Sequence, residues 1–237
     1  MSTPSRLTHG LSTVPKGEPL SYYPLPDPFH TTTNSSGVCT YANDFNTVLA
    51  SSEYTVTGAS STFALVSTVA GGAATLTPGG TTTASSAYKT SQFFQFVSGL
   101  ESWFNCRFQA SAVAGSVSFK VGLQAGSSTN DGIYFSKAAS STALALVSVV
   151  NGTSTTLVTS TTTAAAATWM DVGFHYTGSE IIVFANNAIV ARVASPTIGS
   201  SSTTLTNAIL TPVFQITPTA TDTLTVDFVL SALEVAR

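Results

Sequence analysis

The acidic residues are the first candidates for chemistry, because two carboxylates that face each other can cleave a glycosidic bond. Residues i and i+2 of a strand share a face, so such a pair would place acids two positions apart. No glutamate has another acid within four positions of it; the glutamates are Glu18, Glu53, Glu101, Glu180 and Glu234. Asp222 and Asp227 are five positions apart, which puts them on opposite faces of a strand. We therefore predict that the chain is not an enzyme.

Few residues could support nucleophilic catalysis or metal binding. His9 and His30 lie near the start of the chain, and His175 shares a strand face with Asp171, where we expect it to face solvent or an interface. Residues 127–132 offer a single carboxylate, that of Asp131, whereas a tight calcium cage needs several anionic oxygens. We predict no catalytic residues, no bound metal and no cofactor.

The two cysteines, Cys39 and Cys106, could form one disulfide, but neither has a histidine beside it in the sequence. Alternation along the segment 103–108 places Cys106 on the same inward face as Phe104 and Phe108. Buried reduced thiols are therefore the favoured reading. Pairing between the two stays open at this point.

Composition excludes several classes of partner. The 237 residues include 8 Lys and Arg against 11 Asp and Glu, a net charge of -3, while Ser and Thr together number 72. No basic stripe is available for phosphates, so we expect no nucleic acid partner. The uncharged stretches 54–88, 138–170 and 193–221 are interrupted by Ser, Thr and Gly, so we expect no membrane span. Residues 1–20 lack the apolar block of a secretory signal, and synthesis and folding in a cytoplasm are expected.

From about residue 38 the hydrophobic pattern has the period of two that is typical of strands. Apolar and polar residues alternate over 116–123, 170–177 and 224–231, and the segments 177–180 and 186–187 carry turn residues. Such half-buried antiparallel strands, with no charged linker between them, indicate one all-β domain over residues 37–237. Two sheets packed face to face are the expected architecture.

The first 36 residues have a different character. Six of the ten prolines precede residue 29, so residues 1–36 are predicted to be an extended arm and not a packed helix or inner strand. The arm carries large apolar side chains that we predict to contact a neighbouring subunit: Leu20, Tyr22, Tyr23, Leu25 and Phe29. The alternative is that at least its first dozen residues form a loose terminus.

The segment Trp169–Tyr176, the turn Thr177–Glu180 and the segment Ile181–Ala188 together resemble the characteristic hairpin of concanavalin A-like jelly rolls. The segments Asp131–Phe135 and Leu224–Val229 are similar to a middle strand and to the closing strand of those domains. The resemblance covers roughly residues 40–237 and implies a two-sheet antiparallel jelly-roll sandwich. Its one departure is Asn187 followed by Ala188, where the family hairpin usually closes with glycine.

This sequence combines the jelly-roll pattern with a Ser- and Thr-rich, weakly charged composition. In that combination it resembles head decoration (cement) proteins of tailed bacteriophages. That resemblance implies a non-enzymatic structural protein of the virion, assembled in the host cytoplasm. Its expected partners are the major capsid protein and copies of itself, as a dimer or trimer. The alternative is a lectin-like carbohydrate-binding module of a phage tail, a fibre or a cell-surface protein. Its candidate sugar-binding aromatics are Trp103, Tyr134 and Tyr176.

Overall fold

The computed structural model describes residues 36–46, 53–66, 69, 71–113, 115–201 and 203–236. Apart from Ser36, the predicted arm and all its proposed contact residues lie outside this part of the chain. In the described residues the regular elements are all strands: β1 (Ser36–Asn43), β2 (Tyr54–Thr57), β3 (Thr62–Leu65), β4 (Ala74–Thr77), β5 (Ser85–Lys89), β6 (Ser102–Ala110), β7 (Ser118–Ala125), β8 (Ser128–Lys137), β9 (Ala143–Val150), β10 (Thr153–Thr163), β11 (Met170–Tyr176), β12 (Glu180–Ala185), β13 (Ala188–Ala194), β14 (Ile198–Gly199), β15 (Leu205–Thr206), β16 (Thr211–Thr217) and β17 (Leu224–Ala236).

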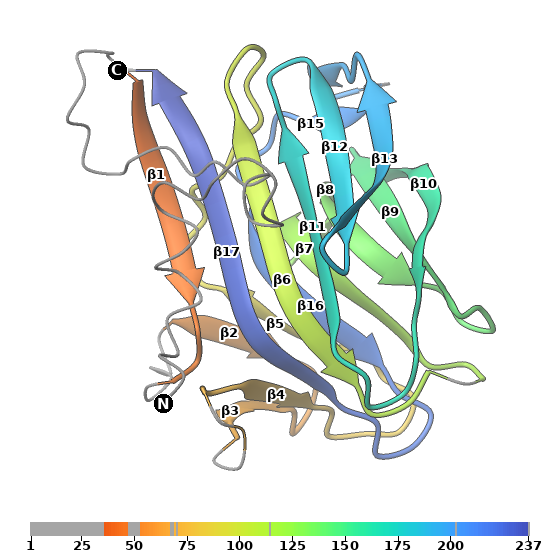
Figure 1. Ribbon diagram of the computed structural model, residues 1–237. Helices are drawn as coiled ribbons and strands as arrows, with labels where there is room; N and C mark the ends of the chain where they lie inside the picture. Colours follow the sequence, from red (N-terminus) through yellow and green to blue (C-terminus); the bar gives the residue numbers. More distant parts are fainter. Residues whose placement is uncertain are drawn as a thin grey trace.

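These strands form two large sheets that pack face to face (Figure 1). The first, which we call the β6 sheet, has the order β13-β12-β11-β6-β17-β4-β3, with β1 paired to β17. The second, the β7 sheet, has the order β10-β9-β8-β7-β16-β5-β2. Every pairing within the two sheets is antiparallel, and only the short β14–β15 pair is parallel. The all-β sandwich predicted from the alternating pattern is confirmed.

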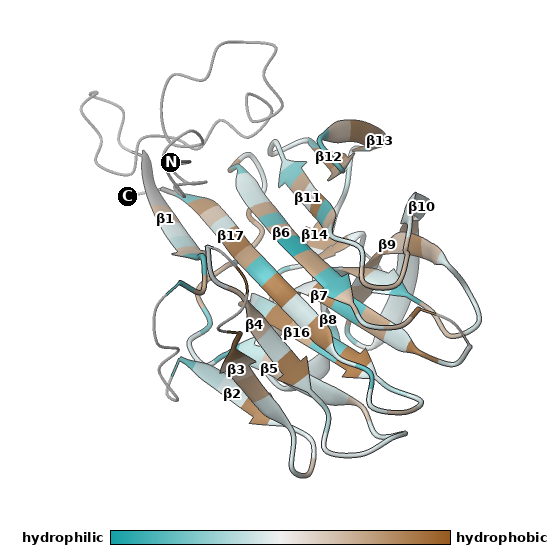
Figure 2. Cartoon of the chain, turned by 60° about the horizontal axis from the view of Figure 1, so that its bottom comes forward, coloured by the Kyte–Doolittle hydropathy of each residue, from teal (hydrophilic) through white to brown (hydrophobic). Residues whose placement is uncertain are grey.

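The core lies between the two sheets and is rich in phenylalanine. Phe104 and Phe174 of the β6 sheet stack with ring centroids 5.6 Å apart, and Phe214 of the β7 sheet stacks on Phe63 at 5.8 Å. Successive residues of a strand point to opposite faces, so the inward aromatics alternate with polar residues, and Figure 2 shows this as bands along β6 and β17. Burying each such side chain contributes about 1.5–3 kcal/mol to folding.

The predicted turn at Asn186 and Asn187 joins β12 to β13. Both residues have positive φ, 49° and 66°, as a two-residue hairpin turn of type I′ requires. Asparagine tolerates this conformation better than most residues, so Asn187 can stand where the family hairpin usually has glycine. The departure from the family pattern leaves the hairpin intact.

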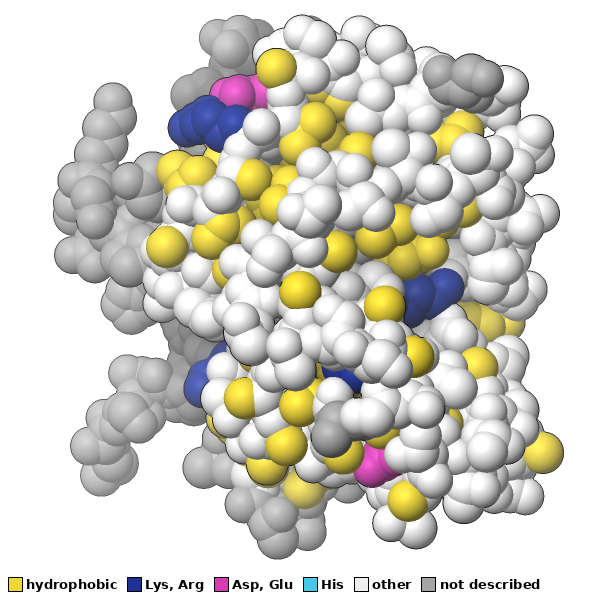
Figure 3. Space-filling model, turned by 90° about the vertical axis from the view of Figure 1, so that its right-hand side faces the viewer, with side chains coloured by type: hydrophobic (Ala, Val, Ile, Leu, Met, Phe, Trp, Pro, Cys, Tyr) yellow, Lys and Arg dark blue, Asp and Glu magenta, His cyan; other side chains and the backbone are white. Residues whose placement is uncertain are grey.

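Charged groups are few on the face shown in Figure 3. Neighbouring strands pair hydroxyl side chains directly, as where Thr57 Oγ1 and Ser86 Oγ lie 2.6 Å apart. Both Cys39 and Cys106 are free thiols, and Cys106 is fully buried on the inward face of β6, as its sequence position predicts. No helix capable of crossing a membrane occurs within the described residues.

Candidate functional site

The outer face of the β6 sheet brings together acids that are far apart in the sequence. Strand β6 lies between β11 and β17, and Arg107 of β6 is directly opposite Asp171 of β11. On its other side the register shifts between Val226 and Phe228, so that Asp227 is the extra residue of a β-bulge. Two acids on different strands therefore flank one arginine.

The contacts within this group, Arg107, Asp171, Asp227, Asn105 and Trp169, are close. Arg107 Nη1 lies 3.2 Å from Asp227 Oδ2, and the guanidinium sits over the Trp169 ring at 5.3 Å from its centroid. Burial raises the pKa of Asp171 to about 6; Arg107 opposes the shift, the charge of Asp227 adds to it, and a hydrogen bond from Asn105 opposes it. Asp171 can thus exchange a proton near neutral pH.

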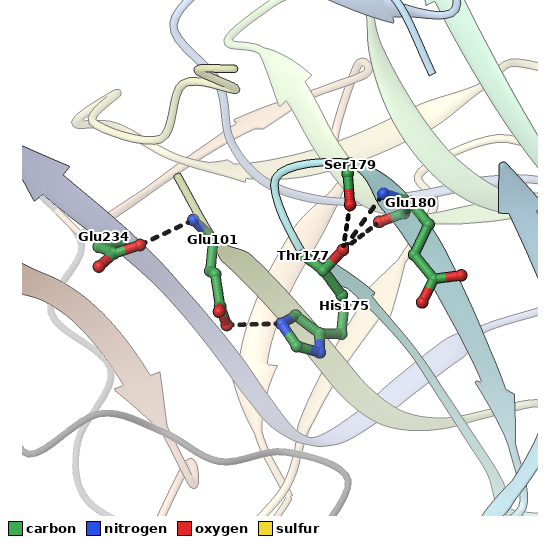
Figure 4. A network of polar contacts seen from close by, with 6 residues as sticks. All are labelled: Glu101, His175, Thr177, Ser179, Glu180 and Glu234. Atoms are coloured by element: carbon green, nitrogen blue, oxygen red, sulfur yellow. Dashed lines mark hydrogen bonds and ion pairs between the residues drawn. The ribbon is translucent and has the colours of Figure 1, made fainter. Parts of the chain in front are cut away.

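His175 belongs to a second polar group further along the same face (Figure 4). Its imidazole stacks on the indole of Trp103, with ring centroids 4.9 Å apart, and its Nε2 lies 2.9 Å from Glu101 Oε2. The Glu101 backbone N–H donates in turn to the carboxylate of Glu234, at 3.1 Å. His175 is only 7% exposed, so the expectation that it faces solvent is wrong. Burial lowers the pKa of His175, and Glu101 opposes that shift.

Two of the predicted sugar-binding aromatics are buried. Trp103 is 1% exposed and packs with Phe184 and Leu230 in a small apolar cluster on the outer side of the β6 sheet. Tyr176 is also 1% exposed, points into the core against Phe96, and donates its hydroxyl hydrogen to the carbonyl of Gly178. Neither ring offers a face to a ligand in this arrangement.

Tyr134, the third candidate, has a different setting. It lies half-buried on the outer face of the β7 sheet, because its neighbours Ile133 and Phe135 point into the core. It stands opposite Gly122 of β7, where an added Cβ would lie 2.3 Å from the carbonyl oxygen of Ile133. Glycine in a strand commonly marks such a close approach of backbones, and it leaves no side chain beside the Tyr134 ring at this position.

The register extends this row across the sheet to a second tyrosine. Gly122 is opposite Val213 of β16, both of them buried, and Val213 is opposite the half-buried Tyr88 of β5. Three strand spacings separate the two tyrosines, about 14 Å of sheet surface. This row of Tyr134, Gly122, Val213 and Tyr88 is called the tyrosine row below.

A polar row runs beside the tyrosine row. Ser136 of β8, Lys120 of β7, Gln215 of β16 and Ser86 of β5 are in register with one another and half-buried. Lys120 Nζ lies 4.6 Å from the centroid of the Tyr134 ring and donates to Gln124 Oε1 at 2.6 Å. Aromatic faces beside hydrogen-bonding side chains suit a ligand that has both apolar and hydroxyl surfaces.

The described residues contain no group of three or more His, Cys, Asp or Glu side chains that could hold a metal ion. In the segment considered for calcium, Asp131 Oδ1 accepts hydrogen bonds from the Asn151 N–H and from the Thr206 hydroxyl. These bonds connect the β8 end to the β9–β10 turn and to β15. Their evident role is to hold these loops in place.

No family model and no curated protein sequence matches the chain. Its backbone, however, is similar to many solved structures. The endo-1,3-beta-glucanase of Streptomyces sioyaensis has a TM-score of 0.61 and 10% identity, over 88% of this chain and 99% of that one. A lichenase from a mouse hindgut metagenome has a TM-score of 0.58 and 11% identity, over 81% and 98%. Peanut lectin has a TM-score of 0.55 and 9% identity, over 84% and 99%.

The fold is a concanavalin A-like jelly roll. At identities of 9–11% this similarity establishes the fold alone. The fold is the one that the resemblance of the β11–β12 hairpin predicted. The expected function fares differently, because the similar structures include three glucanases, a glycosidic hydrolase and a transglycosylase. The prediction of a non-enzymatic, purely structural virion protein is therefore wrong, and the carbohydrate-binding alternative agrees better with these findings.

The prediction that the chain is not an enzyme is wrong, and the cause is physical. Two acids need not share one strand to lie close together, because the jelly roll places Asp171 and Asp227 on two strands that share the neighbour β6. Their separation in the sequence therefore says nothing about their separation in space. Only the strand order, which the sequence does not reveal, could have paired them.

Proposed function

We propose that this chain is a carbohydrate-binding domain that binds a polysaccharide across the outer face of the β7 sheet. The observation that carries the proposal is the position of Tyr134, half-buried on an outer sheet face and beside Lys120. The other two candidate aromatics, Trp103 and Tyr176, are buried. Proteins with this fold include glucanases and a lectin, which supports a saccharide as the ligand.

The chemistry of a sugar ring matches the two rows. Each pyranose presents apolar C–H groups on its faces, which pack on an aromatic ring, and hydroxyls on its rim, which need donors and acceptors. Tyr134 and Tyr88 would take the ring faces, while Lys120, Gln215 and Ser136 would bind the hydroxyls. The distance between the two tyrosines suits a chain of sugar units better than a single one.

Affinity electrophoresis through gels containing soluble polysaccharides tests the proposal. We expect the native protein to be retarded by at least one of them and Tyr134→Ala to lose that retardation. The matched control is Trp169→Ala, which removes a half-buried aromatic that immediately precedes β11 of the β6 sheet. Loss of retardation in Trp169→Ala but not in Tyr134→Ala would contradict the proposed face, and no retardation by any polysaccharide would contradict the proposed function.

A second candidate function, glycoside hydrolysis, is favoured by one observation. Asp171 and Asp227 flank Arg107 on one sheet face, and burial raises the pKa of Asp171 toward neutrality, as a general acid requires. Reducing-sugar release from β-1,3- and β-1,4-glucans measures this activity directly. Turnover that Asp171→Asn abolishes while leaving saccharide binding unchanged would establish it. Equal release by the native protein and Asp171→Asn would exclude it.

A further inference from the structure

Lys120 is a cation on the outer face of the β7 sheet whose contacts are neutral groups. Among the described residues in the strands of the β7 sheet, Lys120 is the only charged one whose side chain lies on the outer face. The other charged residues of these strands, Asp131, Lys137 and Lys89, occupy the alternate, inward positions of the register. The contacts of Lys120 are the amide oxygen of Gln124 and the ring of Tyr134, and both are neutral. Arg107 and Arg192 of the β6 sheet each have a carboxylate within 3.2 Å, whereas Lys89, at the inward end of β5, lies over the rings of Tyr41 and Phe93.

A half-buried ammonium group with no carboxylate partner raises the free energy of the folded protein unless a bound anion compensates it. Partial burial lowers the pKa of Lys120 to about 8, and no carboxylate opposes the shift. At neutral pH the group is still mostly charged, so the polar row carries one positive charge, beside the tyrosine row, within a protein of net charge -3. The ammonium group lies over the Tyr134 ring, 4.6 Å from its centroid, so a sugar that packs on the remaining part of that ring would bring its substituents within reach of Lys120.

Building on the proposed carbohydrate function, we propose that the polysaccharide bound at the tyrosine row is acidic, and that Lys120 binds the carboxylate or sulfate group of a sugar stacked on Tyr134. Gln124 orients the ammonium group from one side, because its Oε1 accepts a hydrogen bond from one of the three ammonium N–H groups. Two donors remain for the anion. Gln215 and Ser136, in register on either side of Lys120, can bind the neighbouring hydroxyls.

Polymers that share one backbone but differ in charge distinguish specificity for acidic saccharides from carbohydrate binding in general. The probes are laminarin and hydroxyethyl cellulose as neutral polymers, their carboxymethylated and sulfated counterparts, and polygalacturonate. We expect the native protein to bind an acidic member at least tenfold more tightly than its neutral counterpart, in titration calorimetry at 0.15 M salt. The sulfated and carboxymethylated polymers identify which anionic group is preferred.

Two variants test the role of Lys120 itself. Lys120→Gln should lose at least tenfold more affinity for the acidic polymer than for its neutral counterpart, while Lys120→Arg should retain most of the affinity for both. The control Arg192→Gln removes the same charge from the β6 sheet and should bind as the native protein does, which shows that net charge is not responsible. Circular dichroism and thermal melting show that each variant is folded.

The outcomes are distinct. Equal or tighter binding of the neutral polymers, or acidic binding that Lys120→Gln leaves unchanged, overturns the acidic specificity but leaves the carbohydrate function intact. Failure to bind any of the polymers overturns both. Equal losses in Lys120→Gln and Arg192→Gln would show non-specific attraction to a polyanion and would also overturn the inference.

Discussion

The carboxylate of Asp227 contacts the guanidinium of Arg107 from a β-bulge, with 3.2 Å between Oδ2 and Nη1. The bulge is what turns the aspartate toward this neighbour, because it adds one residue to β17 where β6 has none. The Asp227 side chain is 2% exposed and that of Arg107 is 39% exposed. The pair therefore has one buried and one partly hydrated member.

Replacing the buried member should destabilise the fold. Asp227→Asn keeps the shape but removes the charge that faces Arg107, and we expect a loss of about 1–3 kcal/mol in the free energy of unfolding. Urea denaturation at pH 7 measures this loss. As a control, Glu180→Gln breaks the more exposed pair with Arg192 and should cost less than about 1 kcal/mol. Equal losses in the two variants would contradict this account.

Asp171 should behave in the opposite way. Its pKa is raised in the folded state, so between about pH 4 and pH 6 the folded protein binds more protons than the unfolded chain and gains stability as the pH falls. Asp171→Asn removes the cost of the buried charge and should stabilise the protein by about 1–2 kcal/mol at pH 7. The difference should vanish near pH 4. A destabilised variant at pH 7 would show that the charge of Asp171 is needed.

His175 adds a pH dependence of the reverse sign. Burial lowers its pKa in the fold, so the unfolded chain binds the extra proton first, and stability falls as the pH drops below the ordinary histidine value near 6.5. His175→Gln should remove this part of the acid loss while leaving stability at pH 8 nearly unchanged. Thermal melting from pH 8 to pH 5 gives the comparison. A native-like acid loss in the variant would assign the effect to other groups.

The sequence was sufficient for the fold and insufficient for the site. Alternation along 170–177 and the asparagines at 186 and 187 predicted β11, β12 and their turn, since side-chain direction and turn conformation depend on local residues. Which strands are neighbours depends on the whole chain. Local sequence therefore does not show that the acids at 171 and 227 share one sheet face, or that the tyrosines at 88 and 134 share another.

Burial was the second quantity that sequence could not supply. Trp103 and Tyr134 are both aromatic residues of strands, and nothing in their immediate neighbours shows that the first is buried and the second half-buried. Tyr176 differs in this respect, because the alternation over 170–177 already places it on the inward face of β11 with Phe174 and Val172. Its hydroxyl reaches the carbonyl of Gly178 in the turn, where it is satisfied within the fold.

Saccharide binding should weaken in alkaline solution if Lys120 binds an anionic group. The pKa of Lys120 is about 8, so the free protein loses this charge between pH 7 and pH 9. The facing groups on β8 and β16 are Ser136, Tyr134 and Gln215, and burial raises the pKa of Tyr134, which keeps it neutral throughout this range. We expect affinity for an acidic polymer to fall severalfold from pH 7 to pH 9 and to stay constant in Lys120→Gln.

The two cysteines should differ in reactivity. Burial raises the pKa of the Cys106 thiol well above its ordinary value, whereas Cys39 lies partly exposed on β1. Thiol titration with Ellman's reagent should therefore detect one reactive group in the native protein and two after denaturation. The variant Cys39→Ser should show none until it is unfolded. A native protein with no reactive thiol and one pair recovered on reduction would reveal a disulfide instead.

The location of the bound saccharide is the most direct test of the account. Amide chemical shifts of the isotope-labelled protein, followed by NMR during titration with a retained oligosaccharide, report which sheet the ligand contacts. We predict the largest changes along the tyrosine row and polar row, at Gly122, Tyr134 and Gln215, with little change at Asn105 or Gly173 of the β6 sheet. Changes centred on the β6 sheet, or scattered over both sheets without saturation, would contradict the account.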